Sequence, residues 1–192
     1  ENGFTDDVIG YDFVDQQNAN IGDYLERDPI PYDEMGHGTL VSGVIAAQTN
    51  NKIGISGIAY NSKIVTLRAF DATGNAETDD IASAIIYAAL NSIKVMNFSF
   101  GENLNSPLLY SAIKFANSLG CVMIGSKGNN GWALPHFPSD YPEVIAVGSS
   151  TPSNYRDIRS NYGSNLSLLA PGSNIFTTDV NSSYKFASGT SL

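Results

Sequence analysis

Residues 95–125 read VMNFSFGENLNSPLLYSAIKFANSLGCVMIG, and this stretch decides the fold. An apolar run over 95–100 has the length of a buried strand, and a second run over 122–125 repeats it. Between them, Ser106 and Pro107 are typical of a helix start, and Gly120 of a helix end. The apolar residues of this segment have helical spacing: Leu109, Ala112, Ile113 and Ala116. A strand, a helix and a second strand predict a β-α-β unit with parallel strands.

The same alternation continues on both sides of this unit. Strands are predicted over 8–13, 64–70 and 144–147, and helices after Gly36 and over 78–89. Further short strands are predicted over 166–169, 175–177 and 184–186. This order indicates one α/β domain over residues 1–192, a doubly wound parallel sheet with helices on both faces. Right-handed crossovers place the carboxyl ends of the strands at one edge, where such sheets bind their ligands.

Composition excludes several classes of function. The chain has 192 residues, a net charge of −9 and a pI of about 4.4, so no basic patch is available for nucleic acid. No apolar run approaches the ~20 residues of a membrane helix. Cys121 is the only cysteine, so an intrachain disulfide is impossible. No phosphate-binding glycine motif follows any predicted strand, which argues against a nucleotide-binding domain.

His37 is the candidate general base. It lies in Gly36-His37-Gly38-Thr39, directly before the apolar stripe of a helix. A helix N-terminus disfavours imidazolium, so the ring should stay neutral and able to accept a proton. The alternative is a capping or core histidine, which is commoner for a single His. His136, the other histidine, has no such setting.

Ser191 and Asn129 are the other two candidates. Ser191 lies in Gly189-Thr190-Ser191-Leu192, a sequence that by itself is more often a surface turn than a nucleophile. Asn129 lies in Gly128-Asn129-Asn130-Gly131, which follows a predicted strand. A serine, a base and a side-chain amide are three of the four parts that acyl transfer needs. The fourth is a carboxylate that orients the base.

Together, six blocks resemble the subtilisin-like serine proteases, and they stand in the order of that family. They are residues 36–43, 96–101, 128–131, 141–148, 170–172 and 188–191. The resemblance implies that His37 is the general base, Ser191 the nucleophile and Asn129 an oxyanion donor beside the Ser191 backbone N–H. The chemistry would need no cofactor.

The resemblance also implies a polypeptide substrate bound in extended form. One side of its site would be the backbone of Ser99, Phe100 and Gly101. The facing wall of the primary pocket would be Ser126, Lys127 and Gly128. Lys127 stands where the family usually has a small residue. It could line the pocket and favour acidic or polar substrate side chains, or reach solvent along its aliphatic stem; we favour the second interpretation.

The chain departs from the family at its catalytic aspartate. No aspartate before His37 is followed by Thr/Ser-Gly, and Asp33, four residues upstream, is given no catalytic role. We expect the first core strand, with that aspartate, to precede residue 1, and a long central helix to follow Ser191. The domain would then be incomplete at both ends, and the isolated chain inactive and poorly stable. A non-catalytic binding scaffold of the same fold is the alternative.

Three further expectations come from the resemblance alone. The turn at Asn51, Ile53 and Ile55 is similar to a calcium loop of the family, so structural calcium is possible. A pro-segment is expected in the parent protein. The family also implies secretion to the extracellular space or cell surface.

Overall fold

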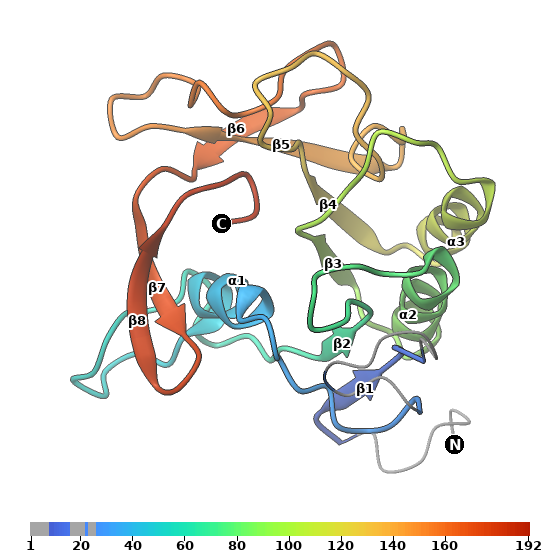
Figure 1. Ribbon diagram of the computed structural model, residues 1–192, viewed down its shortest axis with the longest axis horizontal. Helices are drawn as coiled ribbons and strands as arrows, with labels where there is room; N and C mark the ends of the chain where they lie inside the picture. The colour runs from blue at the N-terminus through green and yellow to red at the C-terminus, as the bar shows by residue number, and fades with distance from the viewer. Residues whose placement is uncertain (1–7, 16–21, 23–25) are drawn as a thin grey trace.

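The computed structural model describes residues 8–15, 22 and 26–192, and these form three helices and eight strands (Figure 1). In chain order the elements are β1 (Gly10–Asp12), α1 (His37–Ala46), β2 (Thr66–Arg68), α2 (Thr78–Leu90), β3 (Val95–Phe98), α3 (Pro107–Ser118), β4 (Val122–Ser126), β5 (Val144–Ser150), β6 (Leu168–Pro171), β7 (Ile175–Asp179) and β8 (Ser183–Ala187). The β-α-β unit predicted over 95–125 is confirmed as β3, α3 and β4.

A four-stranded parallel sheet with the order β3-β4-β5-β6 is the centre of the fold. Val95 lies opposite Val122 in the first pairing, and Met123 opposite Val144 in the second. Ser106 caps α3, because its hydroxyl accepts from the Leu109 N–H at 3.3 Å. The predicted parallel α/β arrangement is therefore confirmed.

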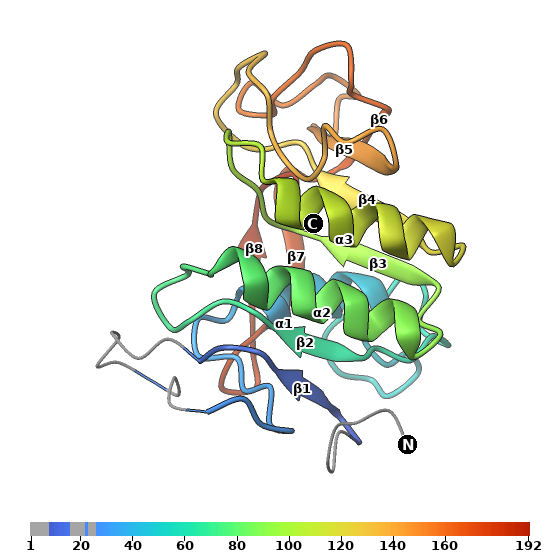
Figure 2. The same cartoon turned by 90° about the vertical axis from the view of Figure 1, so that its right-hand side faces the viewer.

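Helices cover both faces of this sheet. In Figures 1 and 2, α2 and α3 lie side by side over β3 and β4, while α1 lies on the opposite side with the β7–β8 hairpin. The main hydrophobic core fills the space between α2, α3 and the sheet. Its buried side chains include Ile85, Met96, Leu109, Ile113 and Met123. Burial of these apolar side chains is the main force that holds this layer together.

The other parallel pair, β1 and β2, forms a separate sheet. Arg68 of β2 is buried and makes ion pairs with Asp12 and Glu34. Within the described part of the chain, β2 is not hydrogen-bonded to β3. The parallel arrangement is therefore interrupted between β2 and β3.

The antiparallel β7–β8 hairpin links α1 to the end of the chain. The hydroxyls of Thr177 and Thr178 donate to the carbonyl oxygens of Leu40 and Thr39, each at 2.8 Å. A Cβ on Gly43 would lie 2.0 Å from the Thr178 hydroxyl oxygen, so only glycine permits this close approach of helix and strand. Since β8 leads directly to residues 188–191, the hairpin fixes the His37 helix relative to the Ser191 turn.

Candidate active site

His37 is the first residue of α1, as the sequence predicts. Gly36 precedes it with φ +88°, a left-handed conformation that favours glycine. Asp33 binds the start of this helix: its carboxylate accepts from the N–H groups of Gly36 and Thr39 at 2.7 Å and from the Thr39 hydroxyl at 2.6 Å. Asp33 therefore holds the turn that carries His37.

The electrostatics of this turn keep His37 neutral. Burial lowers the pKa of the imidazole, and the nearby Asp33 carboxylate opposes that effect without overcoming it. Burial raises the pKa of Asp33, but hydrogen bonds from Thr39 and Gly36 outweigh it and hold that pKa below its usual value. At neutral pH the ring is therefore uncharged and able to accept a proton. No hydrogen bond joins the imidazole to another described residue.

Ser191 is tied to the carboxyl end of β3. Its hydroxyl donates to the Ser99 carbonyl at 3.3 Å, and the Ser99 hydroxyl donates back to the Ser191 carbonyl at 2.9 Å. This reciprocal pair joins the nucleophile turn to the first residue of the predicted substrate-binding segment. The two segments are far apart in sequence, and only the tertiary structure brings them together.

Asn129 is tied to the residue before Ser191. The Thr190 N–H donates to the Asn129 side-chain oxygen at 2.9 Å, and the Gly128 N–H donates to the Thr190 hydroxyl at 3.1 Å. Because the amide oxygen is engaged as an acceptor, the NH₂ of Asn129 is left to donate beside Ser191. Thr190 is buried and was missed in the sequence, where it is only the middle residue of a Gly-Thr-Ser turn.

Comparison with known proteins agrees with this geometry. Residues 5–192 match the model of the Subtilase family. The chain belongs to the subtilase family. The resemblance inferred from the six sequence blocks is thereby confirmed.

Several relatives of this subtilase are proteases by name. It is 39% identical over 185 residues to a thermophilic serine proteinase of Bacillus sp. (strain AK1), covering 96% of this chain and 43% of that protein. It is 36% identical to thermitase of Thermoactinomyces vulgaris over 170 residues, 88% of this chain and 61% of thermitase. The chain thus spans about half the length of these relatives.

A solved structure confirms the fold of this subtilase. A protease from Pseudoalteromonas arctica PAMC 21717 superposes with a TM-score of 0.86 at 30% identity, covering 95% of this chain and 66% of that one. The prenylagaramide maturation protease PagA superposes with a TM-score of 0.76 at 28% identity, covering 81% of this chain and 58% of PagA. Among the described residues, no helix has both the length and the apolar content that crossing a bilayer requires.

The predicted substrate-binding residues of this subtilase follow two adjacent strands. Ser99, Phe100 and Gly101 leave the carboxyl end of β3, and Ser126 to Gly128 end β4 and leave it. The favoured interpretation, in which Lys127 reaches solvent, is wrong: the residue is 1% exposed, and its ammonium group makes an ion pair with Asp140. An isolated lysine in a sequence does not reveal a buried carboxylate partner in a separate turn.

Asn161 is a second residue that the sequence analysis missed. It is buried, and its side-chain oxygen accepts from the N–H groups of Asn130 and Trp132, each at 3.0 Å. Its NH₂ donates to the Lys127 carbonyl at 3.0 Å. One side chain therefore holds both ends of the loop that presents Asn129.

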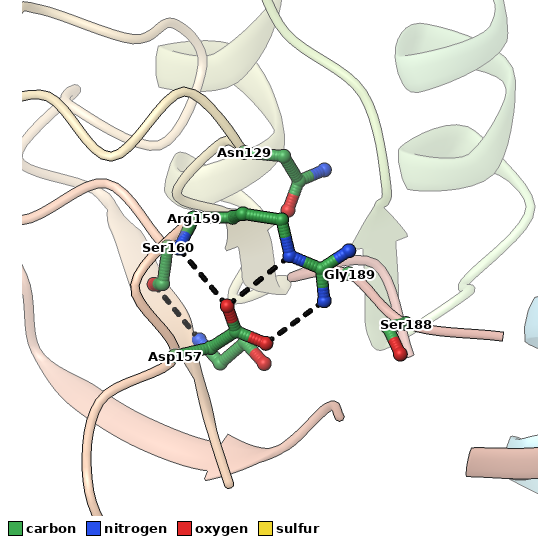
Figure 3. A pocket seen from close by; sticks show the side chains of 7 residues that line it. Asn129, Asp157, Arg159, Ser160, Ser188 and Gly189 are labelled. Atoms are coloured by element: carbon green, nitrogen blue, oxygen red, sulfur yellow. Dashed lines mark hydrogen bonds and ion pairs between the residues drawn. The ribbon is translucent and has the colours of Figure 1, made fainter. Parts of the chain in front are cut away.

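A small polar pocket of about 80 Å³ adjoins Asn129 (Figure 3). The guanidinium of Arg159 makes an ion pair with Asp157 at 3.0 Å, and this partner holds the pKa of Asp157 well below its usual range. Ser188 and Gly189 of the nucleophile turn form another part of the lining. Ser149 also lines the pocket, and its buried hydroxyl has no partner among the described residues.

A larger cavity of about 270 Å³ lies beside Ser191 and is mostly apolar. Its lining comes from α1, the turn at Ile58 and Ala59, the strands β3, β4 and β5, and the end of the chain. The apolar members include Val41, Val44, Ile45, Ile124, Val147 and Leu192. The candidate nucleophile therefore borders the apolar space, while Ser188 and Gly189 of its turn border the polar pocket.

The predicted calcium turn is present as a tight loop. The Ile53 N–H donates to the Asn51 side-chain oxygen at 3.0 Å. With the Ile55 carbonyl, this turn offers at most three neutral oxygens, whereas calcium takes six to eight. The described residues also contain no group of three or more His, Cys, Asp or Glu arranged for a metal. These residues alone do not fit a complete calcium site.

Proposed function

We propose that the parent protein is a serine endopeptidase that works through an acyl-enzyme. Ser191 attacks the carbonyl carbon of a peptide bond while His37 accepts its hydroxyl proton. The negative charge on the carbonyl oxygen is stabilised by the NH₂ of Asn129 and the backbone N–H of Ser191. His37 then gives its proton to the leaving amine. Water, deprotonated by the same base, hydrolyses the ester and restores Ser191.

One observation carries this proposal. The Thr190 N–H fixes the Asn129 side-chain oxygen at 2.9 Å, directly before the candidate nucleophile. A scaffold without chemistry has no need for an amide whose donor end is left beside a serine hydroxyl. The protease names of the relatives give independent support.

The substrate in this proposal is an extended polypeptide. The backbone of Ser99 to Gly101 follows β3 and would add to the substrate main chain as a neighbouring strand does. The segment from Ser126 to Gly128 lies on the adjacent strand and would face it across the primary pocket. We propose, from the family alone, that the parent carries a pro-segment and acts outside the cell.

We further propose that the carboxylate orienting His37 comes from a strand outside these 192 residues. The break between β2 and β3 supports this proposal, because strands on both sides run parallel and lack a hydrogen-bonded neighbour across it. An added parallel strand would join the two sheets and end near His37. The chain alone would then be inactive.

The large apolar cavity beside Leu192 also supports the proposal that further chain completes the domain in the parent protein. We propose that chain continuing past Leu192 covers Val41, Ile45 and Ile124 in the parent. Purified residues 1–192 should then unfold without a cooperative thermal transition, whereas the parent should show one. A sharp transition in the isolated chain would contradict this proposal.

The test of function is active-site labelling of the parent protein. A fluorescent phosphonate should label Ser191, and mass spectrometry of a digest should locate the adduct. Ser191→Ala should remove the label, and His37→Ala should slow it strongly because the hydroxyl loses its base. A folded parent that neither takes the label nor cleaves any peptide would favour the non-catalytic scaffold instead.

Calcium remains a separate structural proposal. If the parent adds carboxylate or carbonyl ligands to the turn at Asn51, chelation with EDTA should lower the Tm of the parent, and added calcium should restore it. The Asn51→Ala variant should lose most of that response. A Tm that does not change on chelation removes the proposal without affecting the catalytic one.

A further inference from the structure

The imidazole of His136 lies between the two predicted walls of the primary pocket. A Cβ on Gly101, in the first wall, would lie 2.3 Å from the Cε1 atom of His136. A Cβ on Gly128, in the facing wall, would lie 2.8 Å from its Cδ2 atom. Opposite edges of one ring therefore touch two glycines that leave neighbouring strands. The ring fills the space that these two glycines leave open.

His136 is held in this position by its own turn. The His136 N–H donates to Asp140 at 3.0 Å, and the Ser139 hydroxyl donates to the His136 carbonyl at 2.7 Å. The ring nitrogen Nδ1 lies 3.3 Å from the same hydroxyl. Only 7% of the residue is exposed. Rotation of the ring away from the glycines would break the contact of Nδ1 with Ser139.

A buried ion pair fixes this turn against the pocket wall. Lys127, between Ser126 and Gly128, pairs with the same Asp140 that accepts the His136 N–H. On the other side, the Glu102 N–H, next to Gly101, donates to the Phe137 carbonyl at 2.9 Å. Both walls are thus joined directly to the residues around His136, so the ring cannot withdraw without moving them.

The surroundings of the ring carry little net charge. The positive charge of Lys127 is balanced by Asp140. Burial lowers the pKa of His136, and the nearby Lys127 lowers it further. The imidazole is therefore neutral at neutral pH, and no unpaired charge faces the space between Gly101 and Gly128 from these three side chains.

We propose that His136 closes the base of the primary pocket and restricts the residue that donates the scissile carbonyl to small, uncharged side chains such as alanine or serine. This inference rests on the proposed protease function and names its substrate class. An aromatic or long aliphatic side chain would have to occupy the volume of the imidazole. A small side chain would contact the ring without displacing it, so discrimination comes from excluded volume.

The test compares two substrates of the active parent protein that differ at one residue. N-acyl tetrapeptide nitroanilides ending in alanine or phenylalanine are suitable. The unchanged parent should show a kcat/KM at least about 10-fold higher for alanine, since occupied pocket volume discriminates by roughly 10–200-fold. His136→Gly should raise kcat/KM for phenylalanine about 10-fold or more, with a change below about threefold for alanine.

A matched control leaves the ring in place. Ser164→Ala removes an exposed hydroxyl whose partner is Asn165 and not His136, so the alanine-to-phenylalanine ratio should change less than about threefold. If His136→Gly fails to fold, the substrate series on the unchanged parent still decides, because equal cleavage of both substrates overturns the proposal. An unchanged ratio in a folded, active His136→Gly variant overturns it as well.

Failure of this inference can be told from failure of the proposed function. A parent that takes the phosphonate label at Ser191 and cleaves the phenylalanine substrate freely is a protease with an open pocket. A parent that takes no label from small or aromatic phosphonates and cleaves neither substrate lacks the proposed function. In the second case His136 has no substrate to select, so the proposed function and this inference are both wrong.

Discussion

Hydrogen bonds join the turn that carries Ser191 to Asn129, through Thr190, and to Ser99 directly after β3. His37, by contrast, is placed by packing of α1 on β7. On the nucleophile side, Thr190 and Ser99 take part in four hydrogen bonds with lengths between 2.9 and 3.3 Å. On the base side, the main constraint is the close approach at Gly43 and the two threonine hydroxyls of β7.

This difference shows which catalytic groups are held by contacts within the described residues and which are not. The turn that carries Asn129 follows β4, and the turn that carries Ser191 follows β8. Hydrogen bonds of Thr190 connect the two turns directly. The imidazole of His37 has no hydrogen-bond partner among the described residues, and the parallel strands β2 and β3 are not hydrogen-bonded to each other. The first side is complete in this chain, and we propose that the second is completed by added chain.

The largest expected effect is the loss of kcat when His37, on the base side, or Ser191, on the nucleophile side, is removed. In the parent protein, His37→Ala and Ser191→Ala should each lower kcat on the order of 10⁶-fold, a magnitude known from subtilisin, itself a member of this family. The double variant should lose no more than either single one, because the two groups act in one proton transfer. Steady-state kinetics measure this directly. Additive losses would show that His37 and Ser191 act independently.

The next effect concerns the nucleophile side alone. Asn129→Ala should lower kcat by roughly 10²–10³-fold with little change in KM, the range known for removing this donor from subtilisin. The reason is that the amide stabilises charge that exists only in the transition state. Asn130→Ala is the matched control, since it changes the adjacent exposed asparagine, and kcat should stay the same. A loss mainly in KM would instead assign Asn129 to substrate binding.

The contact between α1 and β7, which positions His37, can be weakened by a substitution at Gly43. Gly43→Ala places a methyl group 2.0 Å from the Thr178 hydroxyl and 2.8 Å from that of Thr177, so it should destabilise the parent by about 1–3 kcal/mol. Gly38→Ala lies in the same helix with its nearest neighbour at 3.5 Å, and should be neutral or stabilising by up to about 1 kcal/mol. Denaturant unfolding measures both. Equal stability of the two variants would contradict the proposed role of Gly43.

The smallest effect is a shift in pH dependence. Imidazolium cannot accept the Ser191 proton, so kcat/KM should fall as pH drops through the pKa of His37. The Asp33 carboxylate raises that pKa, so Asp33→Asn should lower it and move the acid limb of the profile to lower pH. Thr39→Val keeps the charge while removing a hydroxyl that binds Asp33, and should leave the limb in place. A limb that moves upward in Asp33→Asn would contradict this electrostatic account.

Local sequence patterns were sufficient to predict the helices and strands and to identify the candidate catalytic residues. The apolar runs and helical stripe of residues 95–125 predict β3, α3 and β4 because strand and helix periodicity depend on near neighbours in the chain. The start of α1 at His37 follows from the glycines around it and the apolar stripe after it. Six ordered blocks were likewise sufficient to recognise the family.

Contacts between distant segments were decided by the tertiary structure alone. The pairing of Lys127 with Asp140 joins two separate turns, and so does the position of His136 between Gly101 and Gly128. The break between β2 and β3 is also non-local, since strand pairing is set by hydrogen bonds between segments rather than within them. Spacing along the chain thus indicated which groups this subtilase has for chemistry. Packing of separate strands and turns determined which groups meet, because contacts between remote residues leave no periodic signal in the sequence.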